Sequence, residues 1–160
     1  VRTIIELSTT SLLQNWGYSP VTDAEVQAMA HDLKAVLQPK GVLFAEDASG
    51  RAVGFAITLP DVNTLLKGLN GRLFPFGFIK LLTGIPRLTR YRMFALGVIP
   101  EYQGRAVDSL IYRAMYDTLF TPDLWMEINY VLEDNWAMIN AIRKLGARPS
   151  RRYSIYEGAI

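Results

Sequence analysis

Residues 96–108 read LGVIPEYQGRAVD, and this stretch decides the predicted fold. The apolar run that ends at Ile99 predicts the end of a buried strand, residues 100–104 predict a turn, and the residues from Val107 onward predict an amphipathic helix. Backbone N–H groups at such a helix start, aided by the helix dipole, form an anion site whose usual guest is a pyrophosphate. The alternative is the same strand, turn and helix with no ligand.

The residues before this stretch predict helices followed by a β-hairpin. Residues 1–16 loosely have the apolar spacing of a helix, although the Ser and Thr residues among them disfavour one. Thr22 and Glu25 have capping-box spacing and begin a helix with clear apolar periodicity. A turn-rich segment then separates two apolar runs, residues 42–45 and 53–57, and this arrangement predicts a hairpin.

Short helices, strands and longer helices are predicted after the hairpin. Asp61 is placed to cap a short helix, and residues 70–86 predict a loop with one short helix because Gly and Pro punctuate them. The predicted strands are residues 91–99, 124–132 and 152–156. The helices between them begin at Val107 and at Asp134 or Asn135. This order predicts an α/β fold with a mixed sheet flanked by helices.

The composition predicts one globular domain over residues 1–160. Half of the residues are apolar, and 17 basic residues against 15 acidic ones give a net charge of +2, so no nucleic-acid partner is expected. The chain has one His and no Cys, which excludes a Cys zinc site and a Cys nucleophile, and no metal is expected. No apolar run is long enough for a membrane span, so we expect no membrane insertion. The lack of Cys fits the cytoplasm.

Residues 103–108 resemble the cofactor-binding signature of the GCN5-related N-acetyltransferase (GNAT) family. That signature reads Gln/Arg-x-x-Gly-x-Gly/Ala. Gln103 fits it and Gly104 follows at one of its variable positions, whereas Ala106 replaces a Gly and Asp108 a small residue. A second resemblance is Asn135, which precedes a helix ending in Lys-Leu-Gly-Ala where the family often has Lys-x-Gly-Phe. Both motifs stand in the family's order of elements, and the likeness, which is to a bacterial branch, covers roughly residues 20–157.

The resemblance implies transfer of an acyl group from acetyl-CoA or another acyl-CoA, the co-substrate, to a small-molecule amine. It places the pyrophosphate on the amides of residues 103–108 and the pantetheine arm along a splayed strand. It also places Asn135 near the thiol of the coenzyme. The implied cofactor contacts are Leu96, Val98, Gln103, Gly104, Arg105, Ala106, Val107, Asp108 and Asn135.

Two departures from the signature are expected to weaken coenzyme A binding. Ala106 adds a methyl group where the backbone must approach a phosphate, and it is tolerable only if its φ is negative. The Asp108 carboxylate suits the helix dipole but competes with an anionic guest. Arg105 offsets that carboxylate from the same turn.

The usual acid of the reaction is absent from this chain. Many GNATs protonate the leaving thiolate with a Tyr seven positions after the Asn, and this chain has Ile142 there. The catalytic candidates are Glu127, Tyr130 and Tyr153, of which Glu127 is placed to accept the amine proton directly or through water. The alternative for Glu127 is a carboxylate on the solvent face of a half-buried strand.

Three residues are predicted to bind the acceptor. Asn15 and Trp16 lie in a connection that often lines the acceptor pocket in this family, although Trp16 equally suits a structural corner. Phe76 belongs to an aromatic stretch, residues 73–78, that is either core or a lid over an apolar acceptor.

The chain begins in or near its first predicted helix, whereas the family fold opens with a strand. We therefore expect a trimmed chain or a C-terminal piece of a longer protein, with the exposed sheet edge covered by a partner copy in a homodimer. The alternative function is a degenerate module that binds acyl-CoA or another ligand, or a protein partner, without turnover. A membrane-surface module based on Phe74, Phe76 and Phe78 is weaker, because one amphipathic patch without a polybasic run binds bilayers poorly.

Overall fold

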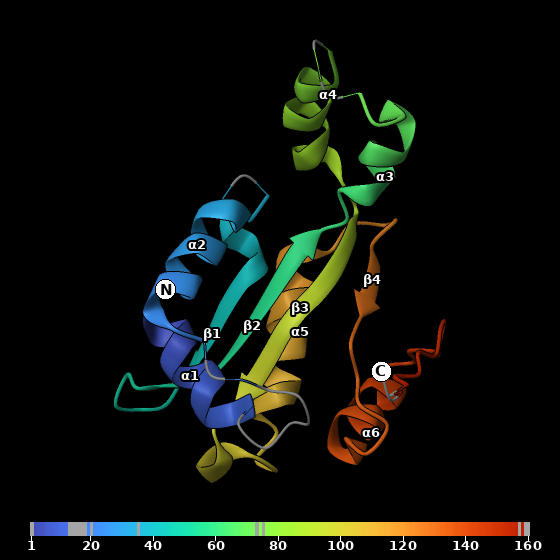
Figure 1. Ribbon diagram of the computed structural model, residues 1–160. Helices are drawn as coiled ribbons and strands as arrows, with labels where there is room; N and C mark the ends of the chain where they lie inside the picture. Colours follow the sequence, from blue (N-terminus) through green and yellow to red (C-terminus); the bar gives the residue numbers. More distant parts are fainter. Residues whose placement is uncertain are drawn as a thin grey trace. The chain divides into compact units, whose positions relative to one another are not determined.

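The computed structural model describes residues 2–12, 19, 21–34, 36–72, 74, 76–156 and 158. Residues 1–129 form one compact unit and residues 130–160 form a second one (Figure 1). The single domain over residues 1–160 therefore stays a prediction.

A four-stranded mixed sheet lies at the centre of the first unit (Figure 1). β1 (Val42–Glu46) and β2 (Ala52–Pro60) form the predicted hairpin. β2 is antiparallel to β3 (Arg90–Val98), and β3 is parallel to the short β4 (Trp125–Ile128). The predicted α/β fold with a mixed sheet is confirmed.

Helices cover both faces of this sheet. α1 (Arg2–Leu12) packs against β2 and β3, and α2 (Asp23–Leu33) lies on the same side, whereas α5 (Val107–Leu119) packs on the opposite face (Figure 1). α1 packs closely on β3 at Gly97. A Cβ atom at this position would collide with Ser11 of α1 and with Phe55 of the neighbouring strand β2. The capping box of α2 is confirmed: the Thr22 N–H donates to the Glu25 carboxylate at 2.8 Å.

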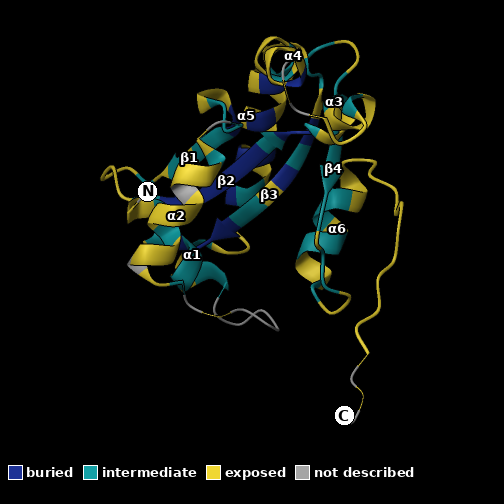
Figure 2. Cartoon of the chain, turned by 45° about the horizontal axis from the view of Figure 1, so that its top comes forward, coloured by how far each residue is buried: buried dark blue, intermediate teal, exposed yellow. Residues whose placement is uncertain are grey.

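The apolar core lies between the sheet and these helices. β2 is buried along almost its whole length because helices cover it on both sides (Figure 2). The buried apolar side chains of the core are Leu7, Val53, Phe55, Ala56, Ile57, Tyr91, Met93, Val98, Ile99, Val107, Ile111, Tyr112, Met115 and Leu119. This core holds β3 and α5 rigidly on either side of the turn that joins them.

The connection from β2 to β3 is a helical excursion, residues 61–89. It contains α3 (Asn63–Leu66), η2 (Lys67–Leu69), α4 (Phe76–Gly84) and η3 (Ile85–Arg87). The two ends of the excursion are joined where the Asp61 N–H donates to the Arg90 carbonyl at 2.8 Å. Asp61 does not cap α3 with its side chain as predicted, because its carboxylate faces arginines of β3 instead.

The second unit contains α6 (Trp136–Lys144). The side-chain oxygen of Asn135 accepts a hydrogen bond from the Met138 N–H at 3.1 Å and so caps the helix as predicted. The predicted strand over residues 152–156 is wrong, because these residues form no regular structure. A strand requires a neighbouring strand to pair its backbone, and the described part of this unit contains none.

Candidate functional site

The turn between β3 and α5 has an unusual backbone. A 3-10 turn, η4 (Pro100–Tyr102), leads out of the strand, and the Gln103 side-chain amide donates to the Val98 carbonyl at 3.0 Å. Gly104 follows with a φ of +71° and Ala106 with a φ of +62°, directly before α5. The Gln103 side chain thus links the turn to the end of β3, and the two left-handed residues direct the backbone toward the start of α5.

The start of α5 leaves backbone donors available. No side chain caps the helix at Ala106. The N–H groups of Gln103 and Arg105 donate to carbonyls of the turn itself. Among the described residues, no backbone carbonyl accepts a hydrogen bond from the N–H groups of Gly104, Ala106, Val107 and Asp108. A Cβ atom on Gly104 would meet no atom of the described residues within 4 Å, so that part of the chain leaves space beside the turn for an anion.

The condition for tolerating Ala106 without strain, a negative φ, is not met, because its φ is +62°. An L-residue in the left-handed region costs about 1–2 kcal/mol because its Cβ crowds the following carbonyl. The geometry of the turn therefore demands the conformation of a Gly while the sequence supplies an Ala. Strain of this kind persists only where the surrounding structure fixes the backbone.

The turn is anchored to the β1–β2 hairpin. The Tyr102 hydroxyl donates to Asp47 Oδ2 at 2.9 Å. Hydrogen bonds from Ser49 and Tyr102 lower the pKa of Asp47 to about 2, and the same contact raises the pKa of Tyr102. The Arg105 guanidinium lies 5.4 Å from the centre of the Tyr102 ring. Sequence reasoning missed this anchor, because an Asp in a turn gives no sign of a partner 55 residues away.

The sheet splays next to this turn. β3 and β4 pair only from Arg90 with Trp125 to Met93 with Ile128, and β3 continues to Val98. A bulge in the β2–β3 ladder falls at the same level, since Ile57 pairs with Ala95 and Thr58 with Met93. The β4-facing edge of β3 beyond Met93 therefore has no strand partner in the described sheet. The predicted splay is present, and Leu96 and Val98 lie on it.

Glu127 belongs to a charged cluster at the opposite end of β3. Its Oε2 lies 2.9 Å from Nη2 of Arg92, and Nε of Arg92 lies 3.4 Å from Oδ1 of the buried Asp61. The Arg92–Asp61 contact is an ion pair without hydrogen-bond alignment. One guanidinium thus serves two carboxylates, and Glu127 is a paired, half-buried group rather than a solvent-facing one.

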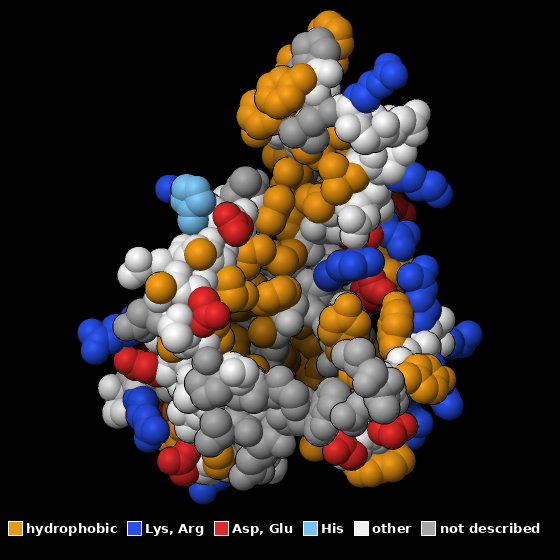
Figure 3. All heavy atoms as spheres, in the orientation of Figure 1, with side chains coloured by type: hydrophobic (Ala, Val, Ile, Leu, Met, Phe, Trp, Pro, Cys, Tyr) orange, Lys and Arg blue, Asp and Glu red, His pale blue; other side chains and the backbone are white. Residues whose placement is uncertain are grey.

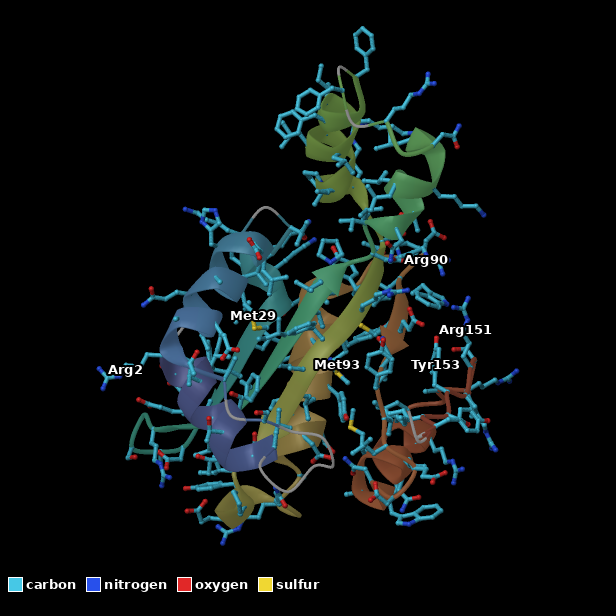
Figure 4. The ribbon with its side chains drawn as sticks, in the orientation of Figure 1. Arg2, Met29, Arg90, Met93, Arg151 and Tyr153 are labelled. Atoms are coloured by element: carbon cyan, nitrogen blue, oxygen red, sulfur yellow. The ribbon has the colours of Figure 1, made fainter. Side chains whose placement is uncertain are left out.

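Arg90 adds a second cation to this cluster. Its Nε lies 4.0 Å from Oδ2 of Asp61, and its guanidinium lies 3.9 Å from the centre of the Trp125 ring. Figure 4 shows Arg90 at the base of the helical excursion and Met93 farther along β3. The Arg-rich start of β3 is visible in the sequence, whereas its partner Asp61 comes from the end of another strand.

The other predicted residues have diverse surroundings. Tyr130 and Tyr153 form an edge-to-face pair in the second unit, with ring centres 5.9 Å apart. Phe76 is 78% exposed, so it is not part of the core. Asn15 and Trp16 lie outside the described residues. Within the described ranges, no group of His, Cys, Asp and Glu side chains is suited to a metal ion, and no helix is long and apolar enough to cross a membrane.

No protein-family model matches the chain. Its fold resembles that of AAC(6′)-Iy in complex with a bisubstrate analogue of coenzyme A and acetylneamine, with a TM-score of 0.58, 18% identity and coverage of 99% of this chain and 94% of that one. It also resembles a GCN5-related N-acetyltransferase from Kribbella flavida, with a TM-score of 0.54, 18% identity and coverage of 90% and 71%. The chain has the GNAT fold.

Two curated proteins are similar to this GNAT-fold chain in sequence. Protein YghO of Escherichia coli K12 is 32% identical over 153 residues, which are 91% of this chain and 39% of that protein. The bacterial ceramide synthase of Caulobacter vibrioides is 32% identical over 167 residues, covering 100% of this chain and 43% of that protein. The chain thus spans less than half the length of these curated relatives.

Proposed function

We propose that the chain carries out acyl-CoA-dependent N-acyl transfer to an amine. The observation that carries this proposal is the open strand edge of β3 beside the uncapped start of α5. An extended pantetheine arm can add its amides to that edge, and the pyrophosphate can bind the N–H groups of Gly104, Ala106, Val107 and Asp108. The solved neighbours with the same fold are N-acetyltransferases.

The chemistry forms one bond and breaks another. The neutral amine attacks the thioester carbonyl, a C–N bond forms, and the C–S bond breaks to release coenzyme A. A backbone N–H of the splayed edge near Leu96 or Val98 stabilises the negative charge that develops on the carbonyl oxygen. Glu127 accepts the proton that the amine loses, and the released thiolate takes a proton from Tyr130, Tyr153 or water.

The donor is acetyl-CoA or a longer acyl-CoA, and the acceptor that we favour is an amine on a long apolar chain. One curated relative is named a ceramide synthase, and a ceramide is the amide of a fatty acid with a long-chain amino alcohol. The exposed apolar side chains of α4 near Phe76 support an apolar acceptor. We propose that the reaction takes place in the cytoplasm. We also propose that the chain forms a homodimer, in which the partner copy covers the sheet edge that the family's first strand would otherwise cover.

A second candidate function is binding of acyl-CoA without turnover. The observation that favours it is Ile142, which stands where many members of the family have the acid Tyr. Both functions need the same coenzyme site, so they differ only in thiol release.

The test begins with calorimetric titration of coenzyme A, acetyl-CoA and palmitoyl-CoA into the chain and two variants. Gly104→Val places a branched side chain over the proposed phosphate site and is expected to weaken binding at least about ten-fold. The matched control is Gly50→Val in the β1–β2 turn, since Gly50 also has a positive φ, +82°, and open space around its Cβ. It is expected to bind like the original chain.

Release of free thiol with a panel of short and long amines then separates the two functions. Binding with amine-dependent thiol release supports the transferase. Binding without release for every amine supports the binding module. If the folded chain binds none of coenzyme A, acetyl-CoA and palmitoyl-CoA, the coenzyme site is excluded and both functions with it. Equal losses of binding affinity in Gly104→Val and Gly50→Val would exclude the site as well.

A further inference from the structure

α4 presents large apolar side chains to solvent and glycines to the protein. Gly77 is buried, and a Cβ atom there would meet the Arg72 backbone. A Cβ on Gly84 would meet the side chain of Leu65 in α3, which shows that this side of α4 packs against its neighbour. A helix that only covered a core would bury its large apolar residues. Here that orientation is reversed, and the outward side needs another explanation.

The outward side of α4, with Phe74 just before the helix, exposes large apolar side chains, and we call this surface the α4 face. Its exposed residues are Phe74, Phe76, Phe78, Ile79 and Leu82. The side chains of Phe76 and Leu82 are 78% and 57% exposed, and the Phe74 and Phe78 rings stack with centres 6.3 Å apart. Figure 3 shows apolar side chains gathered on α4. Contiguous exposed apolar surface of this kind marks an interaction site.

Basic residues are concentrated in the excursion that carries the α4 face. Residues 62–89 contain four basic residues and no acidic one, while the rest of the chain has 13 basic against 15 acidic residues. The four are Lys67, Arg72, Lys80 and Arg87, and all are exposed. The excursion therefore combines exposed aromatic and aliphatic side chains with a positive charge that the remainder of the chain lacks.

We propose that the helical excursion docks on an anionic lipid bilayer. The α4 face enters the boundary between headgroups and acyl chains, and the four basic side chains reach the anionic headgroups. The sequence alone disfavours this role because its aromatic stretch can equally be core and its basic residues are not consecutive. The fold answers both objections, since it exposes the aromatic residues and places the basic ones in the same short excursion.

Charge also decides between a bilayer and a second copy of the chain. A two-fold contact through the α4 face would bring together two excursions that each carry four exposed cations. Like charges at such short range oppose association, whereas an anionic bilayer attracts them. Docking goes beyond the proposed acyl transfer and does not depend on it, because it is measured without coenzyme A.

The experiment is flotation of the 160-residue chain with vesicles of phosphatidylcholine alone or with 30 mol% phosphatidylglycerol. We expect the chain to float with the anionic vesicles and much less with the neutral ones. Flotation with the anionic vesicles is expected to decrease as the salt concentration rises. Phe78→Ser/Leu82→Ser removes two residues of the α4 face, and Lys67→Glu/Lys80→Glu reverses two of its charges. Each double variant is expected to weaken binding to anionic vesicles at least about ten-fold.

Matched controls come from elsewhere on the surface. Tyr116→Ser/Phe120→Ser, in α5 and directly after it, has the same spacing as the first variant and similar exposure, 51% and 55% against 46% and 57%. Lys34→Glu/Lys144→Glu repeats the charge change outside the excursion. Both are expected to float like the original chain, and thermal melting checks that all four variants fold. Absence of flotation by the original chain overturns the proposal, as do equal losses in controls and test variants. If the original chain does not float and Phe78→Ser/Leu82→Ser turns a dimer into a monomer, the face is a self-interface.

Discussion

Nη2 of Arg92 on β3 lies 2.9 Å from Oε2 of Glu127 on β4, and the two residues are direct partners across the parallel strand pair. Strand pairing therefore holds the guanidinium against the carboxylate. Asp61, at the end of β2, shares the same guanidinium. The cluster lies one residue pair before β3 and β4 separate, so the proposed base on β4 lies next to the point where the proposed pantetheine edge of β3 begins.

Glu127→Gln tests the proposed base. We expect amine-dependent thiol release to fall about 100-fold or more, because a positioned general base contributes about 10²–10⁴-fold, while coenzyme A affinity stays unchanged. Asp117→Asn is the control, since it removes a carboxylate from another Arg–carboxylate pair, that of Arg113 and Asp117 at 2.8 Å on exposed α5. Full turnover by Glu127→Gln would exclude the residue from proton transfer.

Ala106→Gly tests the strain at the helix start. We expect it to raise the free energy of unfolding by about 0.5–1 kcal/mol, because Gly adopts the left-handed region without a Cβ clash. We also expect it to tighten coenzyme A binding, since the methyl group beside the proposed phosphate site is gone. Urea unfolding and calorimetry measure the two effects. Ala48→Gly in the β1–β2 turn is the control, and an equal or smaller gain at Ala106 contradicts the assignment of strain.

Two substitutions at Asn135 separate its cap from its proposed coenzyme contact. Asn135→Ala removes the acceptor for the Met138 N–H and is expected to cost about 1 kcal/mol in unfolding experiments. Asn135→Ser replaces the carboxamide by a hydroxyl group that can still cap the helix, so stability is expected to remain. A several-fold loss of acyl-CoA affinity in Asn135→Ser supports the contact. Unchanged affinity in both variants leaves Asn135 with the cap alone.

The anchor between Asp47 and Tyr102 predicts a pH dependence of stability. The folded state lowers the pKa of Asp47 from 3.8 to about 2, so the ionised carboxylate stabilises the fold. This stabilisation is fully present above about pH 4 and is lost as the pH falls toward 2. Urea unfolding at pH 5 and pH 3 is therefore expected to show a smaller drop for Asp47→Asn than for the original chain. An equal drop in both proteins excludes Asp47 as a source of the dependence.

Local sequence signals predicted much of the fold. The capping box of Thr22 and Glu25, the hairpin turn after β1 and the Asn135 cap are all short-range patterns, and all three are present in the structure. The strand predicted over residues 152–156 is absent, because a strand depends on a distant partner rather than on its own apolar alternation. The positive φ of Ala106 could not be read from the sequence for a related reason, since the path of the turn between β3 and α5 sets that angle.

The candidate site likewise has features that local sequence predicts and features that only the tertiary structure sets. The sequence by itself determined the strand–turn–helix around Gly104, because a Gly-containing turn between an apolar run and an amphipathic helix is a local pattern. Only the tertiary structure decided that Arg92 joins Glu127 to Asp61, and that α4 turns Phe78 and Leu82 outward while Gly77 faces the protein. Local patterns depend on residues within one or two turns of the chain. Ion-pair partners and the outward face of a helix depend on which segments the sheet brings together, and that choice is made by the packing of the whole unit.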